Sequence, residues 1–183
     1  MAKRNPVKVL DIETTGTAAD TGLVTAYVLL EGTRPPKVLT RFVAGVSDEK
    51  RALEELLARL RPSDTVVVWR GRAYDVPFLV TRALRHGLDA SPLLRFKVVD
   101  LAEFAEKHMR LDRTSQSSMC RFLGIGKNHD LTGDQMPMKF LEFLSTEDRR
   151  KAREILVHCE DDVRSLYKIF QRMEPLLRAA GEL

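Results

Sequence analysis

The order of its hydrophobic segments constrains the fold of this chain more than any other feature. Three β-branched, apolar runs come first, at residues 7–12, 23–30 and 38–43. Amphipathic stretches then alternate with two short apolar runs, in the order 47–61, 65–69, 75–86 and 96–99. This order predicts an α/β domain with a mixed five-stranded sheet, in which the first three strands form an antiparallel meander and helices flank the sheet.

The C-terminal part of the chain is predicted to be helical. The first helix, at residues 47–61, precedes this part of the chain, and Ser47 is its expected N-cap. Later helices are expected at residues 101–109, 115–122 and 139–144. A capping pattern at residues 145–148 opens a long last helix that should end near Met173, before Pro175. Because no repeat, low-complexity tract or linker divides the sequence, residues 1–183 are expected to form a single domain.

The amino-acid composition indicates the broad class of protein but does not identify a function. The net charge of +4 is compatible with a polyanionic partner but does not require one. The two cysteines, Cys120 and Cys159, lack metal-type spacing and indicate a reducing compartment. No apolar run is long enough to cross a bilayer, and the N-terminus lacks the apolar core of a signal peptide. The expectation is a soluble, cytoplasmic protein with no membrane partner.

Two carboxylates end the first predicted strand. Side chains alternate along a strand, so Asp11 and Glu13 should point the same way and repel each other. A divalent cation would relieve this repulsion, and oxygen ligands suit Mg²⁺ or Mn²⁺. The following Thr14, Thr15 and Gly16 form a turn that a ligand can approach closely. The alternative is an acidic, solvated strand end without a metal.

Further acidic residues follow later elements. Asp75 stands after the strand at residues 65–69 and at a helix start, where it is either an N-cap or a partner of the first two carboxylates. His158 and Asp162 lie one turn apart on the last helix, at the border of its apolar face. They are either site residues or a solvated pair within an acidic patch.

Three segments, in order, resemble the motifs of the DEDD superfamily of 3′–5′ exonucleases, which have an RNase H-like fold. They start at Asp11 (DIETTG), Tyr74 (YDVPFL) and His158 (HCEDDVRSL). The resemblance covers nearly the whole chain and is greatest to YprB-like exonucleases and the proofreading domain of family B DNA polymerases. It implies a metal-dependent 3′–5′ exonuclease that acts on 3′ ends of single-stranded DNA or RNA. It also implies two Mg²⁺ or Mn²⁺ ions, held by Asp11, Glu13, Asp75 and Asp162, about 4 Å apart.

Two positions depart from the family pattern. His158 stands where tyrosine is usual, and the resemblance implies that it is the general base or orients the attacking water. An imidazole, with an ordinary pKa of about 6.5, suits proton transfer at neutral pH. Arg70 stands where asparagine is common, which bears on substrate contact and on metal affinity.

Substrate contacts are expected from the first two motifs and from basic side chains. Thr14, Thr15 and Gly16 are candidates for binding the terminal nucleotide, and Tyr74 and Phe78 for stacking on bases. Either aromatic residue is equally suited to the core, which is the favoured place for Phe78. Candidate phosphate contacts are Arg70, Arg72, Arg110, Arg113, Lys127 and Lys139.

Two other functions use the same fold. One is a nucleic-acid-binding accessory module with weak or no catalysis, which should bind without a divalent ion. The other is a structure-selective endonuclease, which should cut circular substrates. The pathway, a protein partner in DNA repair or replication, and the choice between DNA and RNA are left open by the sequence.

Overall fold

A five-stranded mixed sheet forms the centre of the protein in a computed structural model that describes residues 7–127 and 132–183. Its strands are β1 (Lys8–Thr14), β2 (Val24–Glu31), β3 (Lys37–Phe42), β4 (Thr65–Val68) and β5 (Lys97–Asp100). They lie in the order β3-β2-β1-β4-β5. The first three strands pair antiparallel, whereas β4 runs parallel to both β1 and β5. The predicted sheet and its N-terminal meander are therefore confirmed.

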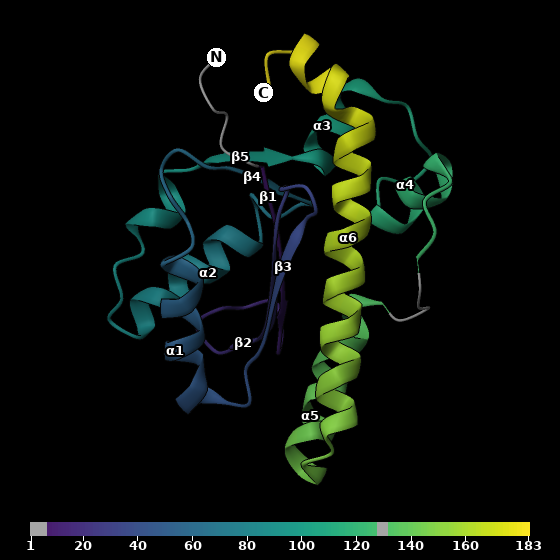
Figure 1. The fold of residues 1–183 in the computed structure, drawn as a ribbon. Coiled ribbons are helices and arrows are strands. Elements are labelled where there is room, and N and C mark those ends of the chain that lie inside the picture. Colours follow the sequence, from purple (N-terminus) through teal and green to yellow (C-terminus); the bar gives the residue numbers. More distant parts are fainter. Residues whose placement is uncertain (1–6, 128–131) are drawn as a thin grey trace.

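Helices cover both faces of this sheet (Figure 1). On one face lie α1 (Val46–Leu57) and α2 (Asp75–Arg85), which share a core with alternate residues of the strands, such as Leu10 and Ile12 of β1. On the other face lie α3 (Leu101–His108), α4 (Gln116–Leu123) and the long α6 (Arg149–Ala179), which pack on Val9, Val28 and Val67. The alternation of strand side chains thus supplies two separate cores.

The helix α5 (Met136–Thr146) packs antiparallel beside the first turns of α6 and reaches β2 (Figure 1). Met136 and Phe140 of α5 form a small core with Ala26 of β2 and Ile155 of α6. Two short 3₁₀ turns complete the described elements, at Ser91–Leu94 and Gly133–Gln135. No helix in the described ranges is long and apolar enough to span a membrane.

Three helix boundaries differ from the sequence expectation. The N-cap of α1 is Gly45 rather than Ser47, which lies inside the first turn and caps no backbone group. The helix α5 starts three residues before position 139, because Met136 is buried and draws the first turn into the core. The last helix continues through Pro175 to Ala179, since Leu177 on the next turn is fully buried and its packing offsets the lost hydrogen bond.

Candidate active site

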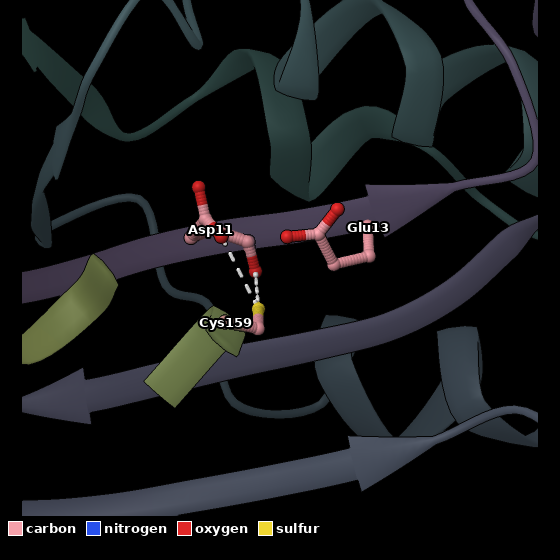
Figure 2. A group of neighbouring side chains, drawn as sticks. All are labelled: Asp11, Glu13 and Cys159. Carbon is pink, nitrogen blue, oxygen red and sulfur yellow. Dashed lines mark hydrogen bonds between the residues drawn. The ribbon is translucent and has the colours of Figure 1, made fainter. Parts of the chain in front are cut away.

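The strand β1 directs Asp11 and Glu13 toward α6. Leu10 and Ile12, which alternate with them, point into the core beneath α1 and α2. The pairing of β1 with β2 has an irregularity between Glu13 and Thr14, so the regular ladder ends just beyond the second carboxylate. Figure 2 shows the carboxyl groups of Asp11 and Glu13 turned toward each other above the Cys159 thiol of α6.

The loop between β4 and α2 brings a third carboxylate to the same place. Asp75 is the first residue of α2, and the backbone N–H of Ile12 donates a hydrogen bond of 3.2 Å to its Oδ1. Gly71 leaves room for this carboxylate, because a Cβ there would stand 2.5 Å from Oδ2 of Asp75. Asp100 holds the loop by accepting hydrogen bonds from the backbone N–H groups of Arg70 and Arg72.

Two residues of α6 complete the group. His158 is 2% exposed, and its Nε2 lies 3.3 Å from Oε1 of Glu13 and 3.6 Å from Oδ2 of Asp162. The Lys127 ammonium contacts Oδ1 of Asp162. Gln116, at the start of α4, donates a hydrogen bond of 2.8 Å from Nε2 to the backbone carbonyl of Asp162. The predicted alternative of a solvated His–Asp pair is therefore wrong for His158, which is buried against β1.

These side chains line one cleft of about 490 Å³. Its walls include the four acidic candidates and His158, together with residues from the turn after β1, the loop before α2 and the start of α5. The lining residues are Asp11, Ile12, Glu13, Thr14, Gly16, Thr17, Trp69, Arg70, Tyr74, Asp75, Gly133, Asp134, Pro137, His158 and Asp162. Segments far apart in the sequence are thus joined at a single opening.

Three acidic side chains of the cleft, those of Asp11, Glu13 and Asp75, resist ionisation. Burial, and then the charges of Asp75 and Asp162, raise the pKa of Asp11 well above its usual range. Burial raises the pKa of Glu13 in the same way, with Asp11 the strongest of the repelling charges. Burial also raises the pKa of Asp75 to about 7. Lys127 partly offsets the repulsion at Asp11 and Glu13.

This donor set fits a divalent cation. Ligand atoms of Asp11, Glu13 and Cys159 all lie within 4.8 Å of one another, and the carboxylates supply the hard oxygen donors that Mg²⁺ and Mn²⁺ prefer. Cys159 donates from Sγ to Oδ2 of Asp11 at 3.2 Å. Burial, followed by the charge of Asp11, raises the pKa of this thiol well above its usual value, so it is a hydrogen-bond donor. A bound cation would neutralise the repulsion that raises the carboxyl pKa values.

The expected nucleotide contacts separate into two groups. Thr14, Gly16 and Tyr74 line the cleft, and the Tyr74 hydroxyl lies 2.7 Å from Oγ1 of Thr14 and donates to the Gly16 carbonyl at 3.1 Å. Thr15 instead ties the turn together, since its Oγ1 accepts the Leu23 N–H at 3.0 Å.

Phe78 is 3% exposed and belongs to the core beneath α1 and α2. Its predicted role in stacking on bases is therefore wrong, and the alternative core assignment holds. The reason is that α2 turns this side chain toward the sheet, while Tyr74, one turn earlier and at the N-cap, stays at the cleft.

The candidate phosphate contacts are also divided. Arg70 lines the cleft, but its guanidinium pairs with Glu106 at 2.5 Å and donates to Oγ1 of Thr114 at 2.9 Å. Arg72 pairs with Glu103, and Lys139 pairs with Glu154 across α5 and α6. Arg110 and Arg113 are exposed on the connection between α3 and α4.

Some residues of the site were not anticipated. The residues of the cleft from Gly133 to Pro137 lie in a stretch without hydrophobic periodicity, so the sequence offered no signal for them. Cys159 is a fully buried residue of α6, and its contact with Asp11 depends on how closely α6 packs on β1. Two of the hydrogen bonds that the Asp100 carboxylate accepts, from the N–H groups of Ala102 and Glu103, follow the N-cap pattern, which was a readable signal.

Comparison with known proteins agrees with this fold. A family model described as the RNase H superfamily matches residues 9–174, whereas no curated protein sequence matches the chain. Among solved structures, the family B DNA polymerase from the hyperthermophilic archaeon Pyrobaculum calidifontis matches with a TM-score of 0.77 over 96% of this chain, at 15% identity. The chain spans only 25% of that polymerase chain, and the likeness shows a shared fold. Since the family model covers most of its length, the chain belongs to the RNase H superfamily.

Proposed function

We propose that this protein is a metal-dependent 3′–5′ exonuclease, a hydrolase that removes nucleotides from the 3′ end of single-stranded DNA or RNA. Membership of the RNase H superfamily supports a nuclease. The observation that carries the proposal is the convergence of Asp11, Glu13, Asp75 and Asp162 with His158 in one cleft. Mere binding of a polyanion does not call for clustered carboxylates, which repel phosphate unless cations intervene.

The four carboxylates would hold two divalent ions, Mg²⁺ or Mn²⁺. When bound, such ions activate water for attack and stabilise the leaving oxygen. The raised pKa values of Asp11, Glu13 and Asp75 support this assignment, because a bound cation offsets both the burial of these charges and the repulsion at Asp11 and Glu13. Asp75 would be fixed for this role by the Ile12 N–H and by the space at Gly71.

His158 is proposed to orient the attacking water or accept its proton. It is buried in the wall of the cleft, between Glu13 and Asp162, so it is positioned by two of the carboxylates. General-base assistance of this kind contributes about 10²- to 10⁴-fold to a rate. Asp162 is in turn held by Gln116 from α4, which limits the movement of this part of α6.

The turn after β1 is proposed to receive the terminal nucleotide. Thr14, Gly16 and Tyr74 form a hydrogen-bonded group at one side of the cleft. The exposed part of the Tyr74 ring offers a surface for a terminal base. Thr15 would contribute indirectly, by holding the turn against Leu23.

The proposal is tested with single-stranded DNA and RNA of matched sequence, labelled at the 5′ end. Each substrate is incubated with Mg²⁺, Mn²⁺ or EDTA, and the Asp11→Ala variant serves as the control. A metal-dependent ladder that shortens from the 3′ end, absent in the control, is the expected result. Cleavage of circular strands would indicate an endonuclease instead. Uncut substrate with metal-independent binding would indicate an accessory module.

A further inference from the structure

The connection between α3 and α4 carries a second charged surface. Four basic residues, at positions 107, 110, 113 and 121, are exposed there. Their side chains form no ion pair or hydrogen bond with any residue within 7–127 or 132–183. Phe122, next to the last of them, is 62% exposed. We call this the α3–α4 basic surface, defined by Lys107, Arg110, Arg113, Arg121 and Phe122.

Two adjoining grooves shape this surface. The first, of about 550 Å³, is lined by residues from the end of α3 and the following loop, including Lys107, Arg110 and Thr114. The second, of about 470 Å³, is lined by Arg113, Arg121 and Phe122, among others. Leu111 lines both grooves, so they meet. The basic side chains therefore border a continuous depression.

This depression begins at the edge of the cleft. Arg70, which lines the cleft, reaches Glu106 and Thr114, and both of these residues line the first groove. A second link comes from α4, where Gln116 donates a hydrogen bond to the backbone of Asp162. The first groove and the candidate active site are thus joined by direct contacts, and α4, which carries Arg121 and Phe122, is also tied to the site.

The charges of the surface identify the ligand that it fits. Two acidic residues, Glu106 and Asp112, line the grooves. Glu106 forms an ion pair with Arg70, whereas Asp112 forms no ion pair within the described residues. The arginines present guanidinium groups, whose geometry suits the two oxygens of a phosphate. An exposed aromatic ring among cations is the arrangement that stacks on unpaired bases.

We infer that the α3–α4 basic surface binds the strand upstream of the 3′ end, as a track for single-stranded nucleic acid outside the cleft. The inference rests on the proposed function for the direction of the strand, but binding itself does not depend on catalysis. The surface would make the protein select strands longer than those that fill the cleft alone.

The first test compares the variant Arg110→Ala/Arg113→Ala/Arg121→Ala with a control of equal charge, Arg59→Ala/Arg61→Ala/Arg85→Ala. Arg59 and Arg61 follow α1 and Arg85 ends α2, and these two helices cover the opposite face of the sheet. Binding of a long labelled single strand is measured in EDTA over a range of salt. Each lost phosphate contact lowers the slope of log affinity against log salt by about 0.7, so the test variant should lose about 2 and the control about 0.

The second test uses Phe122→Ala, with Phe122→Tyr as the matched variant that keeps a ring. Loss of one stacked base weakens binding roughly 5- to 150-fold, and the tyrosine variant should retain most of the affinity. Hydrolysis of a trinucleotide should be unchanged in every variant, because so short a strand does not reach the surface.

Wild-type salt dependence in the arginine variant, or an equal loss in the control, would overturn the inference. So would a loss on the trinucleotide as large as that on the long strand. If the wild-type protein cleaves nothing but the arginine variant still loses affinity for the long strand, the surface stands and the proposed activity fails. The two failures are therefore distinguishable.

Discussion

The Nε2 atom of His158 lies 3.3 Å from Oε1 of Glu13, so a buried imidazole joins the last helix to the first strand. The same nitrogen lies 3.6 Å from Oδ2 of Asp162. This position, between acidic groups from two elements, makes the histidine part of the acidic group rather than a surface residue. The tyrosine that is usual at this position in the family has a longer side chain, and its hydroxyl would reach farther from α6. Because the histidine side chain is shorter, its contact with Glu13 requires α6 to pack closely on β1.

Replacing His158 by asparagine should reduce kcat by about 10²- to 10⁴-fold, the range of general acid–base assistance. Metal binding should persist, because the four carboxylates remain. We expect the thermal shift caused by Mn²⁺ to stay close to that of the wild-type protein. Asp162→Asn is the comparison, since it should lose both hydrolysis and much of the metal-induced shift. An unchanged kcat for His158→Asn would remove the histidine from the mechanism.

Lys127 should compete with the divalent ion. Its ammonium contacts Asp162, and its positive charge reduces the repulsion at Asp11 and Glu13. The lysine therefore supplies part of the charge neutralisation that a bound divalent ion would supply. Lys127→Met should therefore increase the affinity for Mn²⁺, by about ten-fold if 1.4 kcal/mol of attraction is lost. Calorimetric titration of the metal measures this change.

The control for that prediction is Lys139→Met, because Lys139 also forms an ion pair, with Glu154, but neither residue lines the cleft. Its removal should leave metal affinity within two-fold or so of wild type, as is usual for a partly exposed pair away from the site. Weaker metal binding in Lys127→Met would show that the lysine supports the site instead of competing with the metal.

Local patterns predicted the parts of the site that depend on one element at a time. Strand alternation placed Asp11 and Glu13 together, and helical periodicity placed His158 and Asp162 one turn apart. The convergence of these pairs with Asp75 was an inference from sheet topology and family resemblance. It could be made because the order of strands restricts which strand ends can meet.

Contacts that depend on the separation of two packed elements could not be predicted. The hydrogen bond from Cys159 to Asp11 requires α6 to lie within a few ångströms of β1. The choice of Asp162 as the partner of Lys127 depends on the course of an aperiodic loop.

Gly71→Ala should disturb the third carboxylate. The added Cβ would lie 2.5 Å from Oδ2 of Asp75 and 2.7 Å from Cβ of Val68, so one of them must move. Overpacking of this kind costs about 1–3 kcal/mol, and the displaced carboxylate should lower both Tm and metal affinity. Gly126→Ala is the control, since nothing lies within 4 Å of its added Cβ and it lies outside the helices. Equal thermal and metal-binding behaviour of the two variants would show that Gly71 does not position Asp75.

The fully buried Glu49 is expected to stabilise the fold without affecting the site. Burial alone would raise the pKa of Glu49, but hydrogen bonds from Arg82 and His86 outweigh it and lower the pKa. Glu49→Gln leaves a buried guanidinium without its ionic partner and should cost about 3–5 kcal/mol of stability. Glu160→Gln breaks an exposed pair with Arg164 and should cost less than about 1 kcal/mol. Denaturant unfolding measures both, and similar losses would contradict the prediction.

The metal-free protein should become less stable as pH rises from about 5 to about 7.5. The folded pKa of Asp75, about 7, lies above the ordinary unfolded value of about 3.9, so the folded state binds the extra proton. Its stabilising contribution is complete below the unfolded pKa and is lost as pH rises through the folded pKa. Asp11 and Glu13 are shifted in the same direction and add to the loss.

Divalent ions should reverse this trend, because they bind the ionised carboxylates. We therefore expect Mn²⁺ to raise Tm more at pH 8 than at pH 5. In EDTA at pH 8, Asp75→Asn should have a higher Tm than wild type, since a neutral amide replaces a buried charge. Glu49 does not affect this pH dependence of Tm. Its pKa is lowered, so its contribution to stability changes only at more acidic pH. A metal-free Tm that rises between pH 5 and pH 7.5 would show that burial and repulsion do not raise the pKa values of these carboxyl groups in the folded protein.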